Sequence, residues 1–255
     1  MRPLRLAPFA VAFTCLALGV ATAIAAPARN PCTGPEAKHL LCPNLRIGPP
    51  SEIYEDSYDG KLRLHATSDV RSRGRGPMEL RGHRNGPKSM RVVERIYRAG
   101  GGHIDVRTDA SLHFTDVGSY FGGSYWKVHQ LARFELWSVD AHHRLLHRVR
   151  VGPKLNYCLR DLERTRPGRR SPRHWHYPGC NQDPYIHHDT LGTSVGWSDI
   201  YPADYDKQWI GVGGLHGCFA FVMTVDPESL LYESNENDNS SRRLVNLPFR
   251  GDSGC

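Results

Sequence analysis

The sequence has few of the features that mark membrane, helical or nucleic-acid-binding proteins. After residue 25, no run approaches the roughly 18 uncharged apolar residues of a spanning helix, so we expect no membrane span. Sustained helical periodicity is absent, and 25 Gly with 18 Pro disfavour long helices. No CxxC occurs, which leaves little support for zinc or redox chemistry at sulfur. The basic stretches have almost no interleaved aromatic residues and match no recognisable module, so we expect no nucleic-acid partner.

The first 25 residues have the pattern of a secretory signal peptide. Arg2 and Arg5 precede an apolar run at 7–21, and residues 23–25 (AIA) supply the small residues of a cleavage site. We therefore predict that residues 1–25 are removed and that the mature protein is soluble, secreted and extracellular. The length that remains is typical of one large β domain or two small ones.

The cysteines predict a disulfide framework. Of the seven cysteines, Cys15 lies in the predicted signal peptide, which leaves six in an oxidising compartment. An even number of cysteines in that compartment favours disulfides over metal thiolates. Six cysteines allow 15 pairings, so the pairing stays open on number alone. Pairing each cysteine with its neighbour in the sequence favours Cys32 with Cys42, Cys158 with Cys180 and Cys218 with Cys255.

The residue pattern predicts an all-β fold of the immunoglobulin-like sandwich type with long irregular loops. Residues 26–60 read as a Pro-rich, disulfide-stapled segment, and residues 61–255 as a β domain of short strands separated by Gly, Pro, Asn and Asp. Residues 90–97 alternate most clearly. The last two strands, at 218–225 and 244–247, predict a final hairpin. The expected strands before them lie at 62–70, 78–80, 90–97, 104–106, 112–114, 126–139 and 145–159.

Two arginine-rich stretches and one long loop lie outside this strand pattern. The formal charge is +7, and it falls to +5 without Arg2 and Arg5. The arginines gather at 71–75 and 164–173, in loops that contain Gly and Pro. Solvated loop charge is one interpretation, and attraction of an acidic envelope polymer is the other. The segment 160–192 is long for a loop inside a domain and is therefore expected to be functional, with Cys158–Cys180 ordering its first half.

Several motifs, in this order, resemble the catalytic domain of lysyl oxidases, most closely that of exported bacterial relatives. They are 152–161 (GPKLNYCLRD), 192–201 (GTSVGWSDIY), 208–210 (QWI), 226–227 (DP) and 233–235 (ESN). The resemblance extends over roughly 62–247 and implies a lysyl-oxidase-like β domain at 61–255. It also implies oxidative deamination of primary amines or of lysine side chains in proteins, giving aldehydes with release of peroxide and ammonia.

In that family a lysine four residues before a cysteine and a tyrosine in Gly-x-x-Asp-x-Tyr form lysine tyrosylquinone. The resemblance places these precursors at Lys154 and Tyr201. A quinone built into the protein serves as an electron sink, and a carboxylate then removes the substrate's α proton. Asp199, Asp204 and Asp206 are the carboxylates near Tyr201, and we take Asp199 as the candidate base.

The copper motif of the family is replaced in this chain. The resemblance places its His-x-His-x-His at Gly123, Tyr125 and Lys127, and none of these suits copper(II). Alternating positions of a strand share one face, which is why three histidines with that spacing converge. His174 and His176 have this spacing in the long loop and are the alternative metal residues. His129, His187 and His188 could add a third ligand, and the carboxylate of Asp183 or Asp189 could orient a ligating histidine by a hydrogen bond.

Two functions therefore follow from the sequence. One is an exported amine oxidase that uses copper and lysine tyrosylquinone with a non-standard ligand set. The other is a catalytically inactive lysyl-oxidase-like domain without these cofactors, which binds an envelope polymer or a protein partner. In the second, Lys127 fills the metal position with its own charge and pairs with an acidic residue. A purely structural immunoglobulin-like module is a third interpretation, but it leaves the grouping of Lys154, Cys158, Trp197 and Tyr201 unexplained.

Overall fold

The fold is a β-sandwich of two antiparallel sheets. The computed structural model describes residues 29–251 and Cys255, so the predicted signal peptide lies outside the described residues. In the described residues helical structure is confined to three short 3-10 turns, η1 (Pro35–His39), η2 (Ser119–Phe121) and η3 (Glu236–Asp238). The predicted all-β sandwich is confirmed. No helix in this part of the chain is long and apolar enough to cross a membrane.

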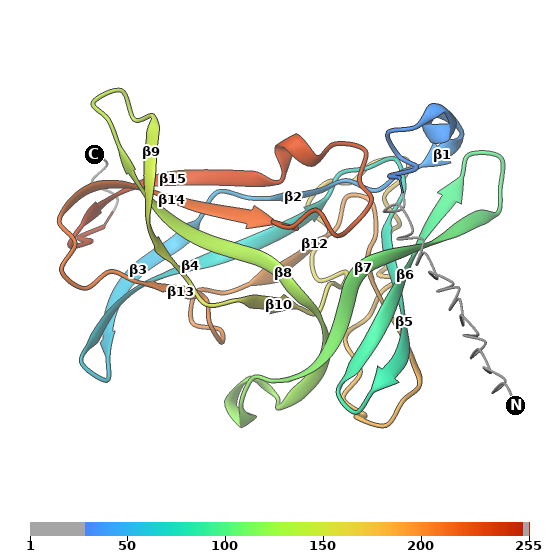
Figure 1. Cartoon of the computed structure of the whole chain (residues 1–255), viewed down its shortest axis with the longest axis horizontal. Helices are drawn as coiled ribbons and strands as arrows, with labels where there is room; N and C mark the ends of the chain where they lie inside the picture. The colour runs from blue at the N-terminus through green and yellow to red at the C-terminus, as the bar shows by residue number, and fades with distance from the viewer. Residues whose placement is uncertain (1–28, 252–254) are drawn as a thin grey trace, which may run out of the picture.

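The larger sheet has ten strands and forms one layer of the sandwich (Figure 1). Its central strand, β8, is the longest and pairs with four others. In order across the sheet the strands are β11 (His188–Thr193), β5 (Met78–Gly86), β6 (Ser89–Arg98), β7 (His103–Asp116), β8 (Ser124–Val139), β14 (Gly217–Val225) and β15 (Ser240–Leu247). Beside this path lie β1 (Leu40–Leu41) on β6, and β9 (Leu145–Val151) and β10 (Leu155–Tyr157) on β8.

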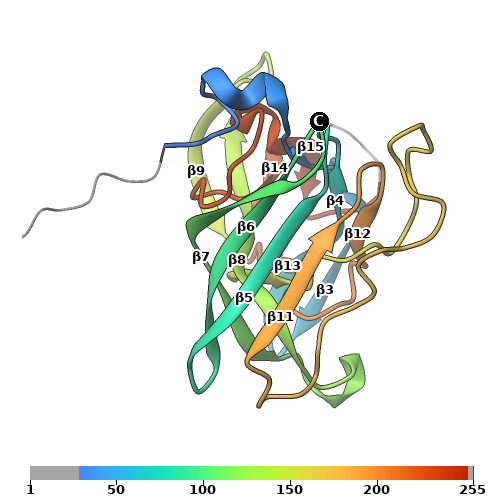
Figure 2. The same ribbon diagram turned by 90° about the vertical axis from the view of Figure 1, so that its right-hand side faces the viewer.

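The smaller sheet has five strands, and the other four each pair with β4. In Figure 2, β4 and β12 lie behind the layer of β5, β6 and β11. The strands of this sheet are β2 (Leu45–Ile47), β3 (Ser51–Tyr58), β4 (Lys61–Ser72), β12 (Ser198–Tyr201) and β13 (Trp209–Gly211). Strands β2 and β3 belong to the segment expected to be Pro-rich and stapled, and both pair with β4.

The core lies between the two sheets and follows the predicted alternation where that was clearest. Along β6, Met90, Val92, Glu94 and Ile96 are buried, as the period of two requires. The last hairpin is also confirmed, because β14 pairs antiparallel with β15. Buried side chains from both sheets form one continuous cluster, which is what holds the layers together.

Two strand predictions differ from the structure. The runs at 104–106 and 112–114 are parts of one strand, β7, whose middle carries polar residues on its exposed face. The run at 145–159 is two strands, β9 and β10, separated at Gly152 and Pro153. Proline has no N–H to donate to a ladder. A Cβ at Gly152 would lie 2.9 Å from the Trp209 carbonyl oxygen, so the chain needs glycine at this close approach.

The disulfide pairing and the ordering of the long loop agree with expectation. The pairs are Cys32–Cys42, Cys158–Cys180 and Cys218–Cys255. The segment after β10 is tied by the buried Asp161, whose carboxylate accepts hydrogen bonds from the backbone of His176, Tyr177 and Ser194. This part of the chain is therefore ordered, and its last residues form β11 at the edge of the larger sheet.

Candidate functional site

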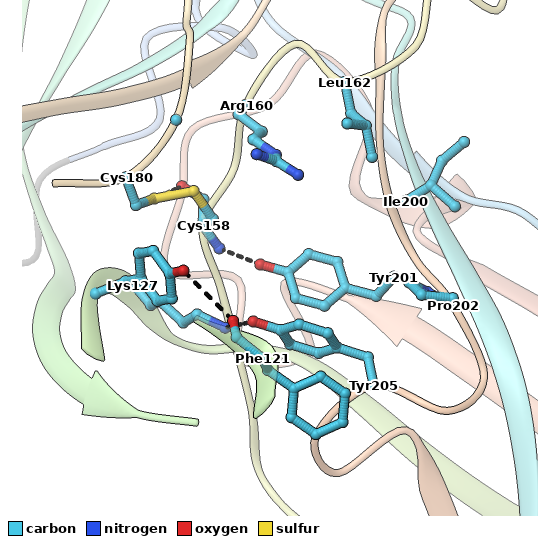
Figure 3. Close-up of a pocket in the computed structure, with 12 residues that line it drawn as sticks. Phe121, Lys127, Cys158, Arg160, Leu162, Cys180, Ile200, Tyr201, Pro202 and Tyr205 are labelled. Atoms are coloured by element: carbon cyan, nitrogen blue, oxygen red, sulfur yellow. Dashed lines mark hydrogen bonds between the residues drawn. A yellow bond between two sulfur atoms is a disulfide. The ribbon is translucent and has the colours of Figure 1, made fainter. Parts of the chain in front are cut away.

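A cavity of about 360 Å³ lies against the Cys158–Cys180 disulfide (Figure 3). Strand β8, the end of β12 and the turn that follows β12 supply half of its lining residues, and the segments around the two cysteines supply most of the others. Tyr201 and Lys127 both line it, so the predicted quinone tyrosine meets one of the replaced copper positions. Apolar side chains such as Leu162 and Ile200 complete the wall, and Arg160 stands over it as a second cation.

Tyr201 is buried at the end of β12. Its strand pairs with β4, and Pro202 ends the pairing because it has no N–H. The hydroxyl oxygen of Tyr201 accepts the Cys158 N–H at 2.7 Å, which holds the ring against the backbone next to the Cys158–Cys180 disulfide. The Tyr157 ring packs against it with centroids 4.3 Å apart. Burial, reinforced by Asp199, raises the pKa of Tyr201 well above its ordinary value, so the phenol is neutral.

Lys127 is a buried amine that faces two tyrosine rings. Its side chain is 2% exposed, and Nζ donates to the Tyr205 hydroxyl at 3.2 Å. Nζ lies 5.0 Å from the Tyr201 ring centroid and 4.8 Å from that of Tyr205. In the described part of the chain it forms no ion pair. Burial lowers the pKa of Lys127 from 10.5 to about 8, although Asp199 and Asp206 act in the opposite direction.

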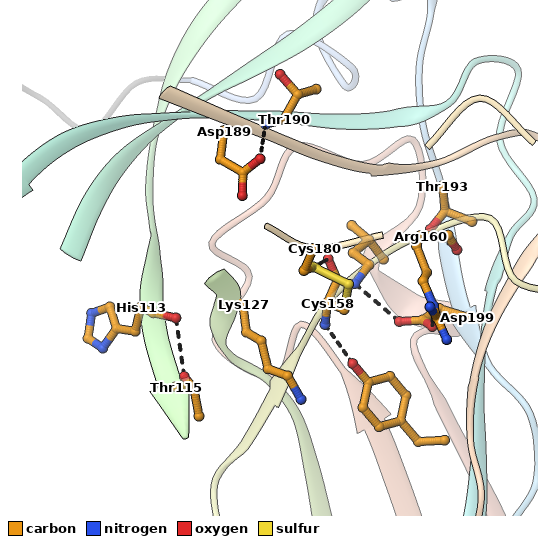
Figure 4. Close-up of a disulfide and its surroundings, with 12 residues drawn as sticks. His113, Thr115, Lys127, Cys158, Arg160, Cys180, Asp189, Thr190, Thr193 and Asp199 are labelled. Carbon is orange, nitrogen blue, oxygen red and sulfur yellow. Dashed lines mark hydrogen bonds and ion pairs between the residues drawn. A yellow bond between two sulfur atoms is a disulfide. The ribbon is translucent and has the colours of Figure 1, made fainter. Parts of the chain in front are cut away.

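Asp199, the candidate base, is completely buried next to this cavity. Its Oδ2 accepts the Leu159 N–H at 3.1 Å, while Oδ1 has no hydrogen-bond donor (Figure 4). The Arg160 guanidinium is its ion-pair partner, with Nε 3.8 Å from Oδ1. Burial raises the pKa of Asp199 to about 7, and the charges of Arg160 and Lys127 partly counter this. The carboxyl can therefore both hold and release a proton near neutral pH.

Tyr205 is a site residue that the sequence pattern did not indicate. The Tyr205 N–H donates to the Pro202 carbonyl at 3.0 Å, and this turn folds its ring back under that of Tyr201. The two rings are nearly perpendicular, with centroids 4.8 Å apart. Burial raises the pKa of Tyr205 to about 12. The proline directly after Tyr201 was the available signal, since it predicts a turn there.

The positions that the resemblance assigns to copper lie just before and at the start of β8, and their residues do not fit copper(II). Gly123 has no side chain, and Tyr125 donates its hydroxyl to the Phe121 carbonyl at 3.4 Å. Lys127 puts an amine that is cationic at neutral pH at the third position. An ammonium repels a dication, and copper(II) in proteins prefers imidazole ligands. The expected pairing of Lys127 with an acidic residue is replaced by its contacts with Tyr201 and Tyr205.

His174 and His176 are both exposed, away from any cluster of candidate ligands. The His176 ring stands edge-on to Tyr177. Within the described residues, the one cluster of three possible ligands is Asp226, Glu233 and Glu236. Of the other three histidines considered as ligands, His129 and His188 lie in pairs with partners that the sequence did not suggest, whereas His187 has no such ring partner among the described residues. These pairs are His129 stacked on His113 and His188 beside His83.

Lys154 lies outside the Tyr201 cavity. Its side chain is exposed just before β10 and lines a separate hollow of about 220 Å³ with Arg133 and Glu228. The two hollows share no residue. The amine that faces the Tyr201 ring in this arrangement is that of Lys127, and a bond between Lys154 and Tyr201 would require a rearrangement.

The two arginine-rich stretches meet in a second hollow. Arg73 from the first stretch lines it with Arg166 and Arg170 from the second, in a volume of about 230 Å³. Arg73 donates through Nη2 to Thr165 at 3.3 Å, while its buried Nη1 has no acceptor. Burial and the neighbouring arginines lower the pKa of Arg73. In the described chain no carboxylate forms an ion pair with these three arginines. Arg166 and Arg170 are exposed, in keeping with solvated loop charge, but the two stretches meet at one hollow.

Comparison with known proteins gives one family. A search of curated proteins finds no match to this chain. The model of the lysyl oxidase family matches residues 118–252, which is more than half of the chain. This range begins before β8 and contains every residue of the Tyr201 cavity. The all-β fold agrees with this match, and the chain belongs to the lysyl oxidase family.

Proposed function

We propose that this lysyl oxidase family protein is secreted and binds an acidic envelope polymer, without the copper and quinone reaction of its family. The observation that carries the binding function is the meeting of Arg73, Arg166 and Arg170 in one hollow with no acidic partner in the described chain. Three disulfides are consistent with an oxidising compartment outside the cell.

The arginine hollow suits an extended anion. Arg170 and Val195 also line a larger adjoining hollow of about 530 Å³, to which Arg75 and Arg98 contribute. Guanidinium groups bind phosphate and carboxylate oxygens in pairs of parallel hydrogen bonds. The exposed Arg166 and Arg170 can offer such donors at the hollow. A chain of repeating anionic units therefore has cationic contacts along both hollows.

Oxidative deamination of primary amines or peptidyl lysine is the alternative that the family suggests. Its metal would need three good ligands near Tyr201, and the residues at those positions are glycine, tyrosine and an amine that is cationic at neutral pH. This donor set argues against the copper reaction. It also argues against a Lys154–Tyr201 cross-link, which depends on copper in this family.

Copper content and cross-linking test the absence of the oxidase reaction. After expression with copper, we expect no stoichiometric metal and no covalent Lys154–Tyr201 or Lys127–Tyr201 peptide by mass spectrometry. The triple substitution Gly123→His, Tyr125→His and Lys127→His serves as the positive control and should gain copper. Stoichiometric copper, or a cross-linked peptide, in the unaltered protein would contradict the proposal.

Binding of poly(glycerol phosphate) tests the arginine hollow. The double variant Arg166→Ser with Arg170→Ser should bind at least about tenfold more weakly, since it loses two charge-assisted contacts. Arg91→Ser with Arg107→Ser is the matched control, because these arginines are exposed on β6 and β7 and carry the same charge. Equal weakening by both pairs would mean that net charge alone attracts the polymer.

A further inference from the structure

Lys127 has the surroundings of a reactive amine. It is buried, its Nζ lies on the wall of an open cavity, and a tyrosine hydroxyl is its hydrogen-bond partner. An amine held by a carboxylate stays charged, whereas one held by neutral tyrosines in a low-dielectric wall is neutral more often. Burial lowers the pKa of Lys127 to about 8, consistent with this geometry. Polymer binding at the arginine hollow does not use this residue.

We propose that the Tyr201 cavity binds small carbonyl compounds that bear a carboxylate, and that Lys127 captures them as an imine. The chemical class is that of aldehydic and 2-oxo acids, with glyoxylate as the simplest member. The site is distinct from the arginine hollow, with which it shares no residue. Buried lysines with lowered basicity are the side chains that form Schiff bases with carbonyl compounds.

The cavity has a place for each part of such a ligand. Its volume of about 360 Å³ is in the range of small-molecule sites. Arg160 lines it and is 40% exposed, so its guanidinium can accept a second anion besides Asp199. Leu162 and Ile200 give the cavity apolar wall on the side of Arg160. A carboxylate at Arg160 would direct the carbonyl carbon inward, toward Lys127 (Figure 3).

The reaction conserves atoms and needs no oxidant. The neutral amine of Lys127 adds to the carbonyl carbon, a C–N bond forms, and the carbonyl π electrons move to oxygen. One proton passes from nitrogen to that oxygen, and the hydroxyl of Tyr205 is the group in hydrogen-bond contact with Nζ for this transfer. The second N–H proton and the new hydroxyl then leave as water, which gives C=N. Asp199, with a pKa of about 7, can supply and recover a proton close to this cavity.

Reductive trapping tests the imine directly. The full protein is incubated with glyoxylate and cyanoborohydride, which converts the imine into a stable carboxymethyl-lysine, and each lysine is then quantified by peptide mapping. We expect Lys127 to be labelled at least about tenfold faster than the exposed Lys61 and Lys88, because Lys127 lines the cavity with Arg160 and burial lowers its pKa to about 8. Labelling of Lys61 and Lys88 with Lys127 unmodified would overturn the proposal.

Two variants separate the roles of the amine and the guanidinium. Lys127→Arg keeps the charge but cannot form an imine and should abolish labelling at this position, while Lys61→Arg should leave it unchanged. Arg160→Gln should lower glyoxylate trapping about tenfold relative to trapping of propanal, which has no carboxylate. An equal effect on both aldehydes would contradict the assignment of Arg160. The site-resolved labelling of the unaltered protein decides the matter even where a variant fails to fold.

Discussion

Replacing Lys127 by Met should stabilise the protein at neutral pH. The folded-state pKa of Lys127 is about 8, against 10.5 for an exposed lysine, so the folded state binds the proton less tightly than the unfolded chain. Each pKa unit corresponds to 1.36 kcal/mol, which makes the ammonium's burial cost about 3 kcal/mol at pH 7. The substitution also removes the hydrogen bond to Tyr205, which lowers stability by about 1 kcal/mol. We expect a net gain of about 2 kcal/mol in unfolding free energy.

The stability difference between Lys127→Met and the unaltered protein should depend on pH. Between about pH 8 and 10.5 the unfolded chain holds more protons at Lys127 than the folded one, so the unaltered protein gains stability as the pH rises. The advantage of Lys127→Met should therefore shrink over this window and reverse above it, where only the lost hydrogen bond remains. Urea denaturation of both proteins with intact disulfides, at pH 7 and near pH 10.5, measures the difference.

The neighbouring carboxyl requires a control. Asp199 is attracted to Lys127, so part of the response to Lys127→Met arises from Asp199. The same substitution in an Asp199→Asn background removes that contribution. If Lys127→Met destabilises the protein at pH 7 in both backgrounds, or gains more at pH 10.5 than at pH 7, the amine is a structural anchor and the reasoning is wrong.

Three further predictions concern the same cavity. Burial raises the pKa of Asp199 from 3.8 to about 7, so the folded state binds this proton more tightly than the unfolded chain, and stability falls as the pH rises through this range. Relative to the unaltered protein, Asp199→Asn should therefore have a higher unfolding free energy at pH 8 than at pH 4, measured by urea denaturation. Tyr201→Phe leaves the buried Cys158 N–H without its acceptor and should lower stability by about 1–3 kcal/mol in the same assay. Cys158→Ser with Cys180→Ser opens a loop of sequence separation 22 and should cost about 3 kcal/mol, read as a lower thermal midpoint.

Much of the fold follows from local sequence patterns. The alternation in β6 places Met90, Val92 and Ile96 in the core, and each is fully buried. The three disulfides pair nearest neighbours, which sequence order alone favours. Strand β7 was harder to predict, because its polar middle residues face outward and interrupt the apolar pattern.

The sequence predicts several residues of the site, but not which of their side chains contact one another. The resemblance to the family assigns Tyr201 to the cofactor and Lys127 to a position of the copper motif. That the two side chains face each other depends on the pairing of β12 with β4 and on how the two sheets pack, and these are contacts between residues far apart in the sequence. The arginine stretches present the same difficulty, since loop residues near 73 and 170 meet only in the folded chain.

The energetic cost of Lys127 is itself an argument about function. A chain that had only lost its metal would gain stability from an apolar residue at this buried position, and a methionine would supply it. Residues that lower stability are expected where a site needs them. Lys127→Met therefore links the two experiments. If the amine serves chemistry, this variant becomes more stable and loses glyoxylate trapping. If the amine serves structure, the variant loses stability, and trapping in the unaltered protein falls on exposed lysines instead.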